Sequence, residues 1–438
     1  MNKIISVLLV IMLLAALPFA ASAAVTDSGT VGEIHWDLDA SGKLTFTGSG
    51  SVPQNGPWAQ YIKNVKTIEL GEGITEILSS TFDQYSNVTT VILGPDLTRV
   101  EGWAFMNMRK IKRFEIYVKQ DCISGSLFAA CKRPDEIVLG EESPYIYEND
   151  MLMTRDGTRL VFGPAKGKAI IPEGIKEVGE YAFYESKITE LTLPKSLESI
   201  GYYAFEECKS LKSLVVPENV KKISSGMFFW CPALKQVTFL NKALEGDEYS
   251  SYSSMFIWCN GLKKVMVPAM ETVGRQLVND CFNLTTIVLG DGTKKIGENA
   301  FSDCKKLKEI YIPDSVESID EGFYDYKTKL TFCCHAGSYA EQFANSHGFT
   351  VVTLTSVSGL TLSETSLALA KGKQGTLAVT VEPADATMQT LDWCSTCDSV
   401  ATVDTKGKVK AVGPGECDIY CLATDGSGVR AVCHVTVE

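Results

Sequence analysis

The stretch Ile296-Gly297-Glu298-Asn299-Ala300-Phe301-Ser302-Asp303-Cys304 returns, with the same spacing, as Ile200-Gly201-Tyr202-Tyr203-Ala204-Phe205-Glu206-Glu207-Cys208. Each copy continues with alternating apolar residues and then a proline. These are Leu307, Ile310 and Ile312-Pro313 in one copy, and Leu211, Leu214 and Val216-Pro217 in the other. Such a recurrence indicates a repeat architecture rather than a single globular core.

One apolar anchor marks each repeat. Most anchors lie 22 or 23 residues apart, in the range of leucine-rich repeats. The anchors are Phe82, Phe105, Phe128, Phe183, Phe205, Phe228, Phe256, Val278, Phe301 and Phe323. The longest step, from Phe128 to Phe183, holds an insertion at about residues 143–168. Asp156-Gly157, between two apolar runs of this insertion, predicts a β-hairpin.

Each repeat is expected to form one coil of a solenoid. In Leu307-x-x-Ile310-x-Ile312 alternate residues point inward, and Pro313 ends the pairing of the strand. A single coil cannot bury its own apolar face, so coils stack, with their strands about 4.8 Å apart. We therefore predict a mainly β chain: a right-handed leucine-rich-repeat solenoid with a parallel sheet on one face.

The repeats resemble the BspA-type leucine-rich repeats of bacterial surface proteins. The Ile-Gly-x-x-Ala-Phe-x-x-Cys stretches, the Ile-Pro steps and the closing stretch Cys334 to Glu341 carry the resemblance. The opening, with Trp36-Asp37-Leu38-Asp39, the run Gly42 to Gly50 and Pro57-Trp58, fits the same family. We interpret residues 24–64 as a β-hairpin cap on the first coil, and residues 65–352 as the repeats.

The periodicity changes after Val352. Short alternating strands such as Leu360-x-Leu362 and Lys408 to Val412, separated by turns such as Lys406-Gly407, predict a small immunoglobulin-like β-sandwich over residues 356–438. The run Glu382 to Thr387 with the later Trp393 and Val400 to Asp404 is similar to the group 2 bacterial immunoglobulin-like (BIG2) domain. We expect Trp393 to be a core residue of this sandwich.

The first 23 residues predict a secretory signal peptide. Lys3 is followed by an apolar run from Ile4 to Ala16, which Pro18 ends, and then by Ala21-Ser22-Ala23. We expect a protein that is secreted or at the cell surface of a bacterium, without a membrane span once the signal is removed. The formal net charge of −12 argues against nucleic acid as a partner.

Eleven of the fourteen cysteines fall into two groups. In the repeats, six lie three residues after an anchor and are expected to be buried thiols. They are Cys131, Cys208, Cys231, Cys259, Cys281 and Cys304. In the C-terminal region we expect one or two disulfides, of open connectivity, among Cys394, Cys397, Cys417, Cys421 and Cys433. The alternative, a zinc site at Cys394-x-x-Cys397, is disfavoured because alternating strand positions suit tetrahedral ligation poorly.

The sequence indicates no enzyme. There is no Gly-x-Ser-x-Gly elbow, His-Glu-x-x-His motif or phosphate-binding glycine loop. None of the four histidines shares a motif with a second plausible ligand. We therefore predict no catalytic residue, no metal and no cofactor; the least favoured alternative is an enzyme with an unrecognised site in the insertion at residues 143–168.

Strand alternation predicts which side chains of the repeat sheet face solvent. We take one outward-facing residue from each of eight successive strands, and we name the row that they form along the sheet the central column. It consists of Glu115, Val138, Thr192, Val215, Thr238, Met266, Val288 and Tyr311. Its later part is apolar or β-branched, and an exposed apolar stripe often marks a partner site.

The resemblance to BspA-type surface proteins implies adhesion as the function, and the residues permit it. The protein would bind an extracellular or cell-surface protein, for example a host or neighbouring-cell matrix protein, through the central column. The alternative is a glycan or cell-envelope binding module that stacks sugars on Trp58, Trp103 and Trp230.

Overall fold

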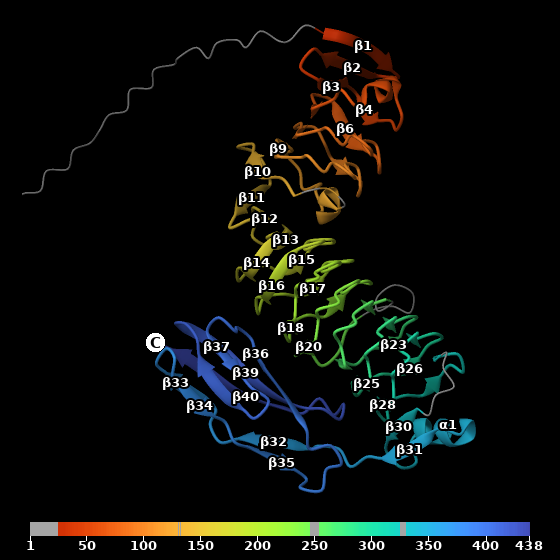
Figure 1. The fold of residues 1–438 in the computed structure, drawn as a ribbon, viewed down its shortest axis with the longest axis vertical. Coiled ribbons are helices and arrows are strands. Elements are labelled where there is room, and N and C mark those ends of the chain that lie inside the picture. The colour runs from red at the N-terminus through yellow and green to blue at the C-terminus, as the bar shows by residue number, and fades with distance from the viewer. Residues whose placement is uncertain (1–24, 130, 132, 246–253, 325–329) are drawn as a thin grey trace, which may run out of the picture.

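A computed structural model describes residues 25–438 except 130, 132, 246–253 and 325–329. The expected signal peptide lies outside the described residues. The chain forms a long curved solenoid that closes with a helix, and residues 356–438 form a separate β-domain beside its C-terminal half (Figure 1). We call this part the C-terminal domain. The predicted mainly β architecture, a solenoid followed by a small antiparallel β-domain, is confirmed.

An antiparallel hairpin opens the solenoid. It is built from β1 (Val25–Val31), β2 (Ile34–Asp39) and β3 (Lys43–Gly48), and β3 pairs in parallel with the next coil. Alternation places Trp36 and Phe46 inward, where both rings contact Trp58 of the 3-10 helix η1 (Pro57–Tyr61). These large buried rings close the apolar end of the first coil.

The main face of the solenoid carries one parallel strand from each coil, and these strands pair in four separate sheets. Its strands are β5 (Thr67–Leu70), β7 (Thr90–Leu93), β9 (Arg113–Ile116), β10 (Glu136–Leu139), β14 (Lys166–Ile170), β16 (Lys187–Thr192), β18 (Ser213–Val216), β20 (Gln236–Phe239), β22 (Lys264–Val267), β25 (Thr286–Leu289), β28 (Glu309–Tyr311), β30 (Thr331–Cys334) and β31 (Thr350–Thr353). In β5, for example, Ile68 and Leu70 are buried while Thr67 and Glu69 are half-exposed, as the alternation predicts.

Short parallel strands also pair on two further faces, where the sequence analysis expected none. One series holds β4 (Gly50–Val52), β6 (Ile74–Ile77), β8 (Arg99–Val100), β15 (Glu177–Val178), β17 (Ser199–Ile200), β19 (Lys222–Ile223), β23 (Thr272–Val273), β26 (Lys295–Ile296) and β29 (Ser318–Ile319). The other holds β21 (Phe256–Ile257), β24 (Val278–Asn279) and β27 (Phe301–Ser302). Two-residue strands carry little sequence signal, so only the stacking of coils reveals them.

The phenylalanine anchors form a spine through the core. Consecutive rings stack with centroids 5.4 Å apart at Phe82–Phe105 and at Phe183–Phe205, and 5.5 Å apart at Phe205–Phe228. In most coils the residues two before and two after the anchor have positive φ, as at Tyr203 and Glu207 around Phe205. The chain therefore turns sharply on both sides of each buried ring.

Four of the repeat cysteines tie their coil to the previous one. The Cys208 thiol donates to the Phe183 carbonyl at 3.1 Å, and Cys231, Cys259 and Cys281 make the same bond to the preceding anchor. All six predicted residues are buried free thiols, as expected. Burial raises the pKa of Cys208 to about 12.

The insertion joins two hydrophobic cores. Its strands are β11 (Tyr145–Glu148), β12 (Met151–Thr154) and β13 (Arg159–Phe162), which pair antiparallel. Leu152 packs in the core of the preceding coils, whereas Met151 and Met153 pack in that of the following coils. Alternate residues of one strand thus enter different cores, because coils cover both faces of β12.

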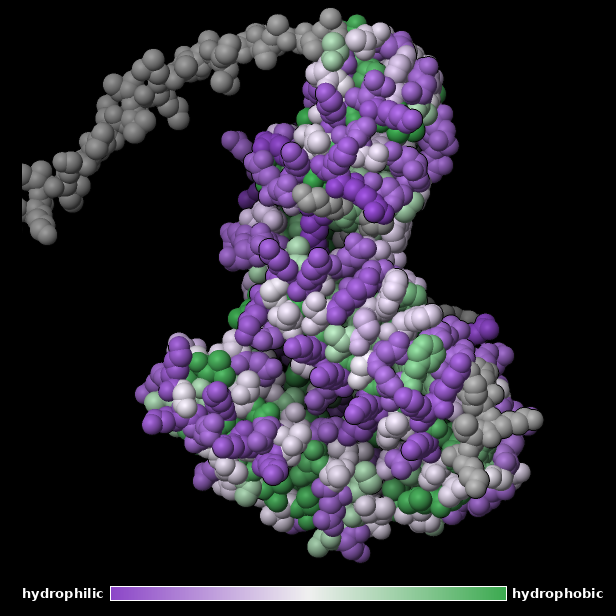
Figure 2. All heavy atoms as spheres, viewed as in Figure 1, coloured by the Kyte–Doolittle hydropathy of each residue, from purple (hydrophilic) through white to green (hydrophobic). Residues whose placement is uncertain are grey.

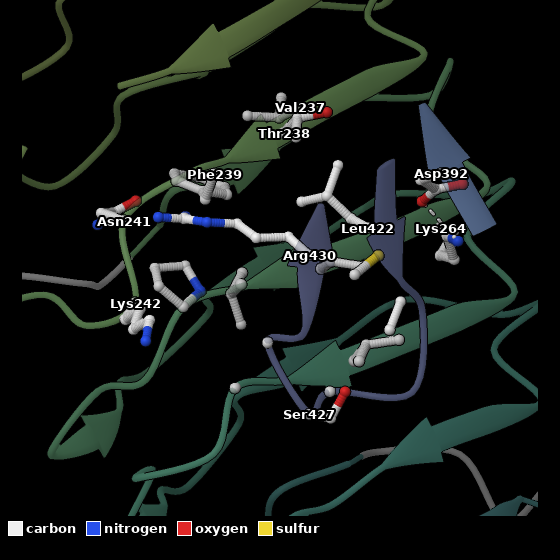
Figure 3. A pocket seen from close by; sticks show the side chains of 18 of the residues that line it. Val237, Thr238, Phe239, Asn241, Lys242, Lys264, Asp392, Leu422, Ser427 and Arg430 are labelled. Atoms are coloured by element: carbon white, nitrogen blue, oxygen red, sulfur yellow. Dashed lines mark ion pairs between the residues drawn. The ribbon is translucent and has the colours of Figure 1, made fainter. Parts of the chain in front are cut away.

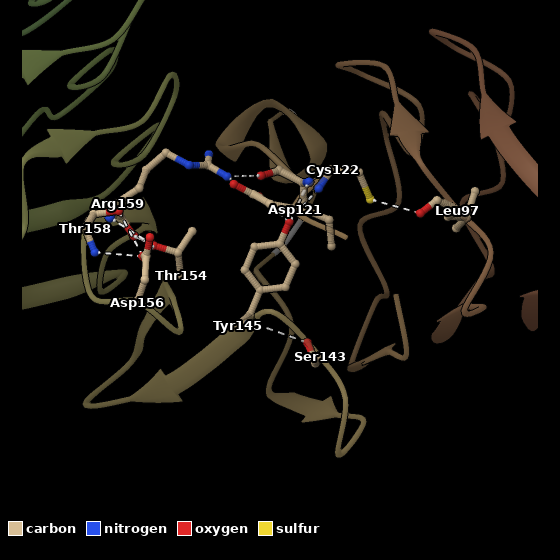
Figure 4. A network of polar contacts seen from close by, with 10 residues as sticks. Leu97, Asp121, Cys122, Ser143, Tyr145, Thr154, Asp156, Thr158 and Arg159 are labelled. Atoms are coloured by element: carbon tan, nitrogen blue, oxygen red, sulfur yellow. Dashed lines mark hydrogen bonds and ion pairs between the residues drawn. The ribbon is translucent and has the colours of Figure 1, made fainter. Parts of the chain in front are cut away.

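A buried tyrosine fixes this junction (Figure 4). The Tyr145 hydroxyl donates to Asp121 at 2.6 Å and accepts from the backbone N–H groups of Cys122 and Ile123, each at 2.8 Å. Arg159 pairs with the same Asp121 carboxylate. The η2 turn (Gly125–Phe128) follows directly.

The solenoid closes with its one described α-helix, α1 (Tyr339–His347), which lies between β30 and β31. Ser338 caps its first turn by accepting from the Glu341 N–H, and Gly348, with φ of 74°, ends it. Buried Phe343 packs against Phe332, so the helix covers the last coil.

The C-terminal domain stacks three small sheets. Its strands are β32 (Gly359–Leu362), β33 (Ser366–Leu369), β34 (Gln374–Thr376), β35 (Val379–Glu382), β36 (Leu391–Ser395), β37 (Ala401–Val403), β38 (Lys408–Ala411), β39 (Gly415–Ala423) and β40 (Arg430–Val437). All described pairs are antiparallel except β33 with β40. Trp393 lies in the core beside Ile419 and Val435, as predicted.

The expected disulfides of this domain are absent: its five cysteines are all free thiols. Strand pairing explains why. Cys417 faces Val435 and Cys421 faces Ala431 across the ladder, so neither has a cysteine opposite. Cys394 follows the inward Trp393 and therefore points out of the sandwich, away from the core that holds Cys433.

Candidate binding surface

The structure divides the central column into an open and a covered half. Glu115 and Val138 are half-exposed, and we call this end of the column the open half. Thr192, Val215 and Met266 are also half-exposed but contact the C-terminal domain: the Thr192 hydroxyl donates to the Cys397 sulfur at 3.8 Å, and Val215 and Met266 pack in clusters with side chains of that domain. Thr238, Val288 and Tyr311, by contrast, are only 7, 1 and 5% exposed, although sequence alternation predicted that they face solvent. They do point out of the solenoid, but the C-terminal domain lies over them.

Charged groups dominate the open half. The Arg113 guanidinium contacts Glu115 at 2.8 Å and Glu136 of the next coil at 2.5 Å, and Tyr117 donates to Glu115 at 2.8 Å. Burial alone would raise the pKa of Glu115, but the hydrogen bonds from Arg113 and Tyr117 outweigh it and lower this pKa. One apolar residue there, Ile170, is 56% exposed; the sequence analysis missed it because β14 begins inside the insertion.

Apolar side chains join the covered half to the C-terminal domain in two clusters. In one, Val288 and Tyr311 pack with Met266 and with Met388. In the other, Leu240 packs with Cys394 and Leu422, and with the partly buried Val215 and Tyr420. The apolar part of the central column is therefore in contact with a β-domain of the same chain.

Three ion pairs surround these clusters. Lys195 pairs with Asp418 at 2.8 Å, Lys264 with Asp392 at 2.7 Å, and Arg430 with Glu218 at 2.9 Å. Burial raises the pKa of Asp418, but the hydrogen bonds from Lys195 and His434 outweigh this effect, so the net shift is downward. Partly exposed pairs each contribute about 1 kcal/mol or less, so they orient the domain more than they hold it.

A glycine allows the closest approach of the two parts. Gly426, in the turn after β39, has a φ of 89°, and a Cβ there would lie 2.7 Å from the Leu289 carbonyl oxygen. The Gly426 carbonyl accepts from the Asp291 N–H at 3.3 Å. Any other residue at this position would both strain the turn and push the domain from the sheet.

A groove remains between the two parts, as the close-up shows (Figure 3). We call it the interdomain groove; it encloses about 770 Å³, and its walls include Asn241, Lys242, Lys263, Met266, Asp392 and Arg430. Arg430 extends across it from the C-terminal domain and donates to the Leu240 carbonyl. A surface view likewise shows a hollow where the domain meets the solenoid (Figure 2).

The three tryptophans that the sequence suggested for stacking on sugars differ in their exposure to solvent. Trp58 is fully buried, so the prediction that it stacks sugars is wrong; Trp103 is half-buried against Tyr181 and Tyr184. Trp230 is 44% exposed, and Trp258, which the sequence analysis missed, is 43% exposed. Both exposed rings lie two residues after an anchor phenylalanine, on successive coils.

Among the described residues, no group of three or more His, Cys, Asp or Glu side chains is arranged to hold a metal ion. Within the same part of the chain, no helix is long and apolar enough to cross a membrane.

Two family models match the chain. The model of the BspA type leucine rich repeat region matches residues 58–154, 167–254 and 249–340, and that of the bacterial Ig-like domain (group 2) matches residues 356–433.

Solved structures of similar fold come from several bacteria. A leucine-rich repeat protein from Eubacterium ventriosum is 20% identical, with 68% of this chain and 96% of that chain covered and a TM-score of 0.41. The pneumococcal vaccine antigen PcpA is 13% identical, with 75% and 99% covered and a TM-score of 0.41. A leucine rich cell surface protein from Faecalibacterium prausnitzii is 16% identical, with 73% and 97% covered and a TM-score of 0.32.

Curated relatives match over short segments. A minor capsid protein of Enterobacteria phage T3 is 41% identical over 80 residues, which are 18% of either chain. An Ig-like virion protein of Serratia phage KSP90 is 38% identical over 86 residues, which are 19% of this chain and 33% of that protein. The chain thus spans a third or less of the length of the curated relatives it matches.

Proposed function

Because the chain belongs to the BspA-type leucine-rich-repeat family and ends in a group 2 bacterial Ig-like domain, we propose that it is a non-enzymatic binding protein of the bacterial cell surface. Its partner is an extracellular or cell-surface protein, and its role is adhesion. The partner contacts the main sheet face of the solenoid, along the open half of the central column. Such faces are the extended binding surfaces of solenoid proteins.

The observation that carries this proposal is the contact with the C-terminal domain. Val288 and Tyr311 are nearly inaccessible because a β-domain packs on them. The main sheet face is thus complementary to a folded β-domain, with apolar anchors in the centre and ion pairs around them, as in interfaces between proteins. Val138 and Ile170 continue this face beyond the covered half.

The test is binding to an array of extracellular-matrix proteins and glycans. We expect the chain to bind to a matrix protein on the array. This binding should fall at least tenfold in a Val138→Asp/Ile170→Asp variant, because a desolvated charge opposes apolar contact with the partner. The matched control is Val25→Asp/Tyr202→Asp, which adds the same charges at exposed apolar residues outside the central column. Equal binding by both variants would contradict the proposed site, and no protein signal at all would contradict the proposed partner.

A specific observation favours glycan binding as the second candidate. Trp230 and Trp258 have φ values of 56° and 59°, a conformation that costs a bulky residue about 1–2 kcal/mol. Most other coils place Glu, Asp, Asn or Gln there, for example Glu207 and Asp280. The ring centroids of Trp258 and Phe282 lie 6.0 Å apart on successive coils, so the exposed Trp258 has a second, half-buried aromatic ring beside it, which suits stacking on sugars.

The same array tests this candidate. A glycan signal that survives Val138→Asp/Ile170→Asp but is lost in Trp230→Ala/Trp258→Ala would favour the aromatic rings. If neither variant loses the glycan signal, neither surface is the glycan site.

A further inference from the structure

The interdomain groove carries an excess of positive charge in a protein whose net charge is −12. Five of its lining residues are Lys or Arg and two are Asp. Lys264 and Arg430 pair with Asp392 and Glu218, and these pairs orient the two parts relative to each other. Lys235, Lys242 and Lys263 also line the groove, and none of them forms an ion pair with a described carboxylate.

One buried acceptor in the groove wall is also unsatisfied. Asn241 is 5% exposed, and its Oδ1 has no hydrogen-bond partner, while its Nδ2 donates to the Ala243 carbonyl at 3.4 Å. An unsatisfied buried acceptor costs about 1–3 kcal/mol, and a donor on a ligand would relieve this cost. The side chain lies at one end of the groove, on the side toward which Arg430 extends (Figure 3).

Between these polar groups the walls are apolar. Phe239 and Met266 are half-exposed there, and Leu422 and Val429 face them from the C-terminal domain. The volume of about 770 Å³ lies within the range of sites that enclose ligands.

We propose that the interdomain groove binds an extended acidic peptide segment of the partner protein. Its carboxylates lie beside Lys242 and Lys263, a backbone N–H donates to Asn241 Oδ1, and an apolar side chain packs on Met266. A peptide supplies all three features, whereas a sulfated glycan would match the lysines but not the apolar wall. This inference rests on the proposed function, since it presumes a protein partner, and it assigns that partner a second contact beyond the open half of the central column.

Fluorescence anisotropy of labelled decapeptides tests the proposal on the full chain. The probes alternate Leu with Glu, Gln or Lys. We expect the Glu/Leu probe to bind and the other two to bind at least tenfold more weakly. Lys242→Glu/Lys263→Glu should weaken the Glu/Leu probe at least tenfold, and Asn241→Leu should weaken it a few-fold. The control Lys371→Glu/Lys373→Glu changes two exposed lysines that do not line the groove.

Three results would overturn the inference: no binding of the Glu/Leu probe, equal binding of the Gln/Leu probe, or equal loss in the control variant. One further result would make the groove a polyanionic glycan site instead. In that case heparin binds, Lys242→Glu/Lys263→Glu weakens the binding of heparin, and the Glu/Leu probe does not bind. Failure here is distinguishable from failure of the proposed function. If Lys242→Glu/Lys263→Glu keeps its full signal on the protein array, the groove proposal fails while the central column proposal stands.

Discussion

The Tyr311 hydroxyl donates a hydrogen bond to the Met388 sulfur at 3.2 Å, and so joins the repeat sheet to a domain that begins after the last coil. Tyr311 is the last residue of the central column, and it was expected to face solvent and bind a foreign partner. The same apolar character that suggested a binding surface is instead used within the chain. Partner binding over this half would require the C-terminal domain to move, whereas the open half is accessible as it stands.

Val288→Asp should detach the C-terminal domain. The carboxylate would be buried beneath Gly426 without a partner, at a cost of about 3–5 kcal/mol, which corresponds to a shift of about 100-fold or more in the docked population. Cys394, buried in the contact, reports the change because it becomes accessible to alkylation. The measurement is the labelling rate of Cys394, located by tandem mass spectrometry.

Val138→Asp is the matched control for this experiment, since it places the same charge on the same column where no domain covers it. Cys394 should label at the wild-type rate in this variant. Unchanged labelling in Val288→Asp as well would mean that the packing of Val288 does not hold the domain in place.

The cysteines should be unreactive in the folded protein. Burial raises the pKa of Cys131, Cys208 and Cys394 to about 12, so thiolate is scarce at pH 8. With a disulfide reagent at this pH, we expect rapid reaction at most at Cys397, because burial also raises the pKa of the other partly exposed cysteine, Cys122, to about 12. In guanidinium chloride without reductant all fourteen should react. A lower number in denaturant would reveal disulfides and contradict the free thiols of the structure.

Tyr145→Phe should destabilise the junction of the two cores. The change removes the oxygen that accepts from the Cys122 and Ile123 N–H groups and leaves them without their partner, at a cost of about 1–3 kcal/mol. Tyr147→Phe, whose hydroxyl makes an exposed contact with Asp150 at 3.3 Å, should change stability by about 0.5 kcal/mol or less. Chemical denaturation compares the two, and equal effects would show that the buried network does not stabilise the junction.

Because of Glu206, the free energy of unfolding should decrease as the pH rises toward neutrality. Burial, with smaller contributions from Glu207 and Glu185, raises its pKa from 4.5 to about 7. Between these values the folded state binds more protons than the unfolded state, so the free energy of unfolding decreases with rising pH. Glu206→Gln removes this loss and should raise Tm at pH 7 more than at pH 4.5.

Glu141→Gln, at an exposed carboxylate, is the control for Glu206→Gln and should change Tm little at either pH. A Glu206→Gln effect of equal size at pH 4.5 and pH 7 would contradict the raised pKa.

The local pattern determined the fold because one coil repeats it many times. The spacing of Phe183, Phe205 and Phe228 predicted one coil per repeat, and in the structure these rings stack 5.4–5.5 Å apart; the cysteine three residues later predicted a buried thiol. Alternation along strands likewise predicted which side chains leave the core, including Val288 and Tyr311. These features depend on neighbours within one or two coils, which the sequence contains explicitly.

The tertiary structure alone decided which outward residues are accessible. Tyr311 lies against Met388, Gly426 against Leu289 and Lys264 beside Asp392, although no periodicity connects these pairs in the sequence. Nor did alternation reveal that β12 has both faces buried, or that Trp58 is fully enclosed while Trp258 is not. A strand's period tells which side of its own sheet a residue occupies, but burial also depends on what the rest of the chain places on that side. For this protein that neighbour is the C-terminal domain, so the sequence determined which side chains point out of the solenoid and the fold determined how many of them are open to solvent.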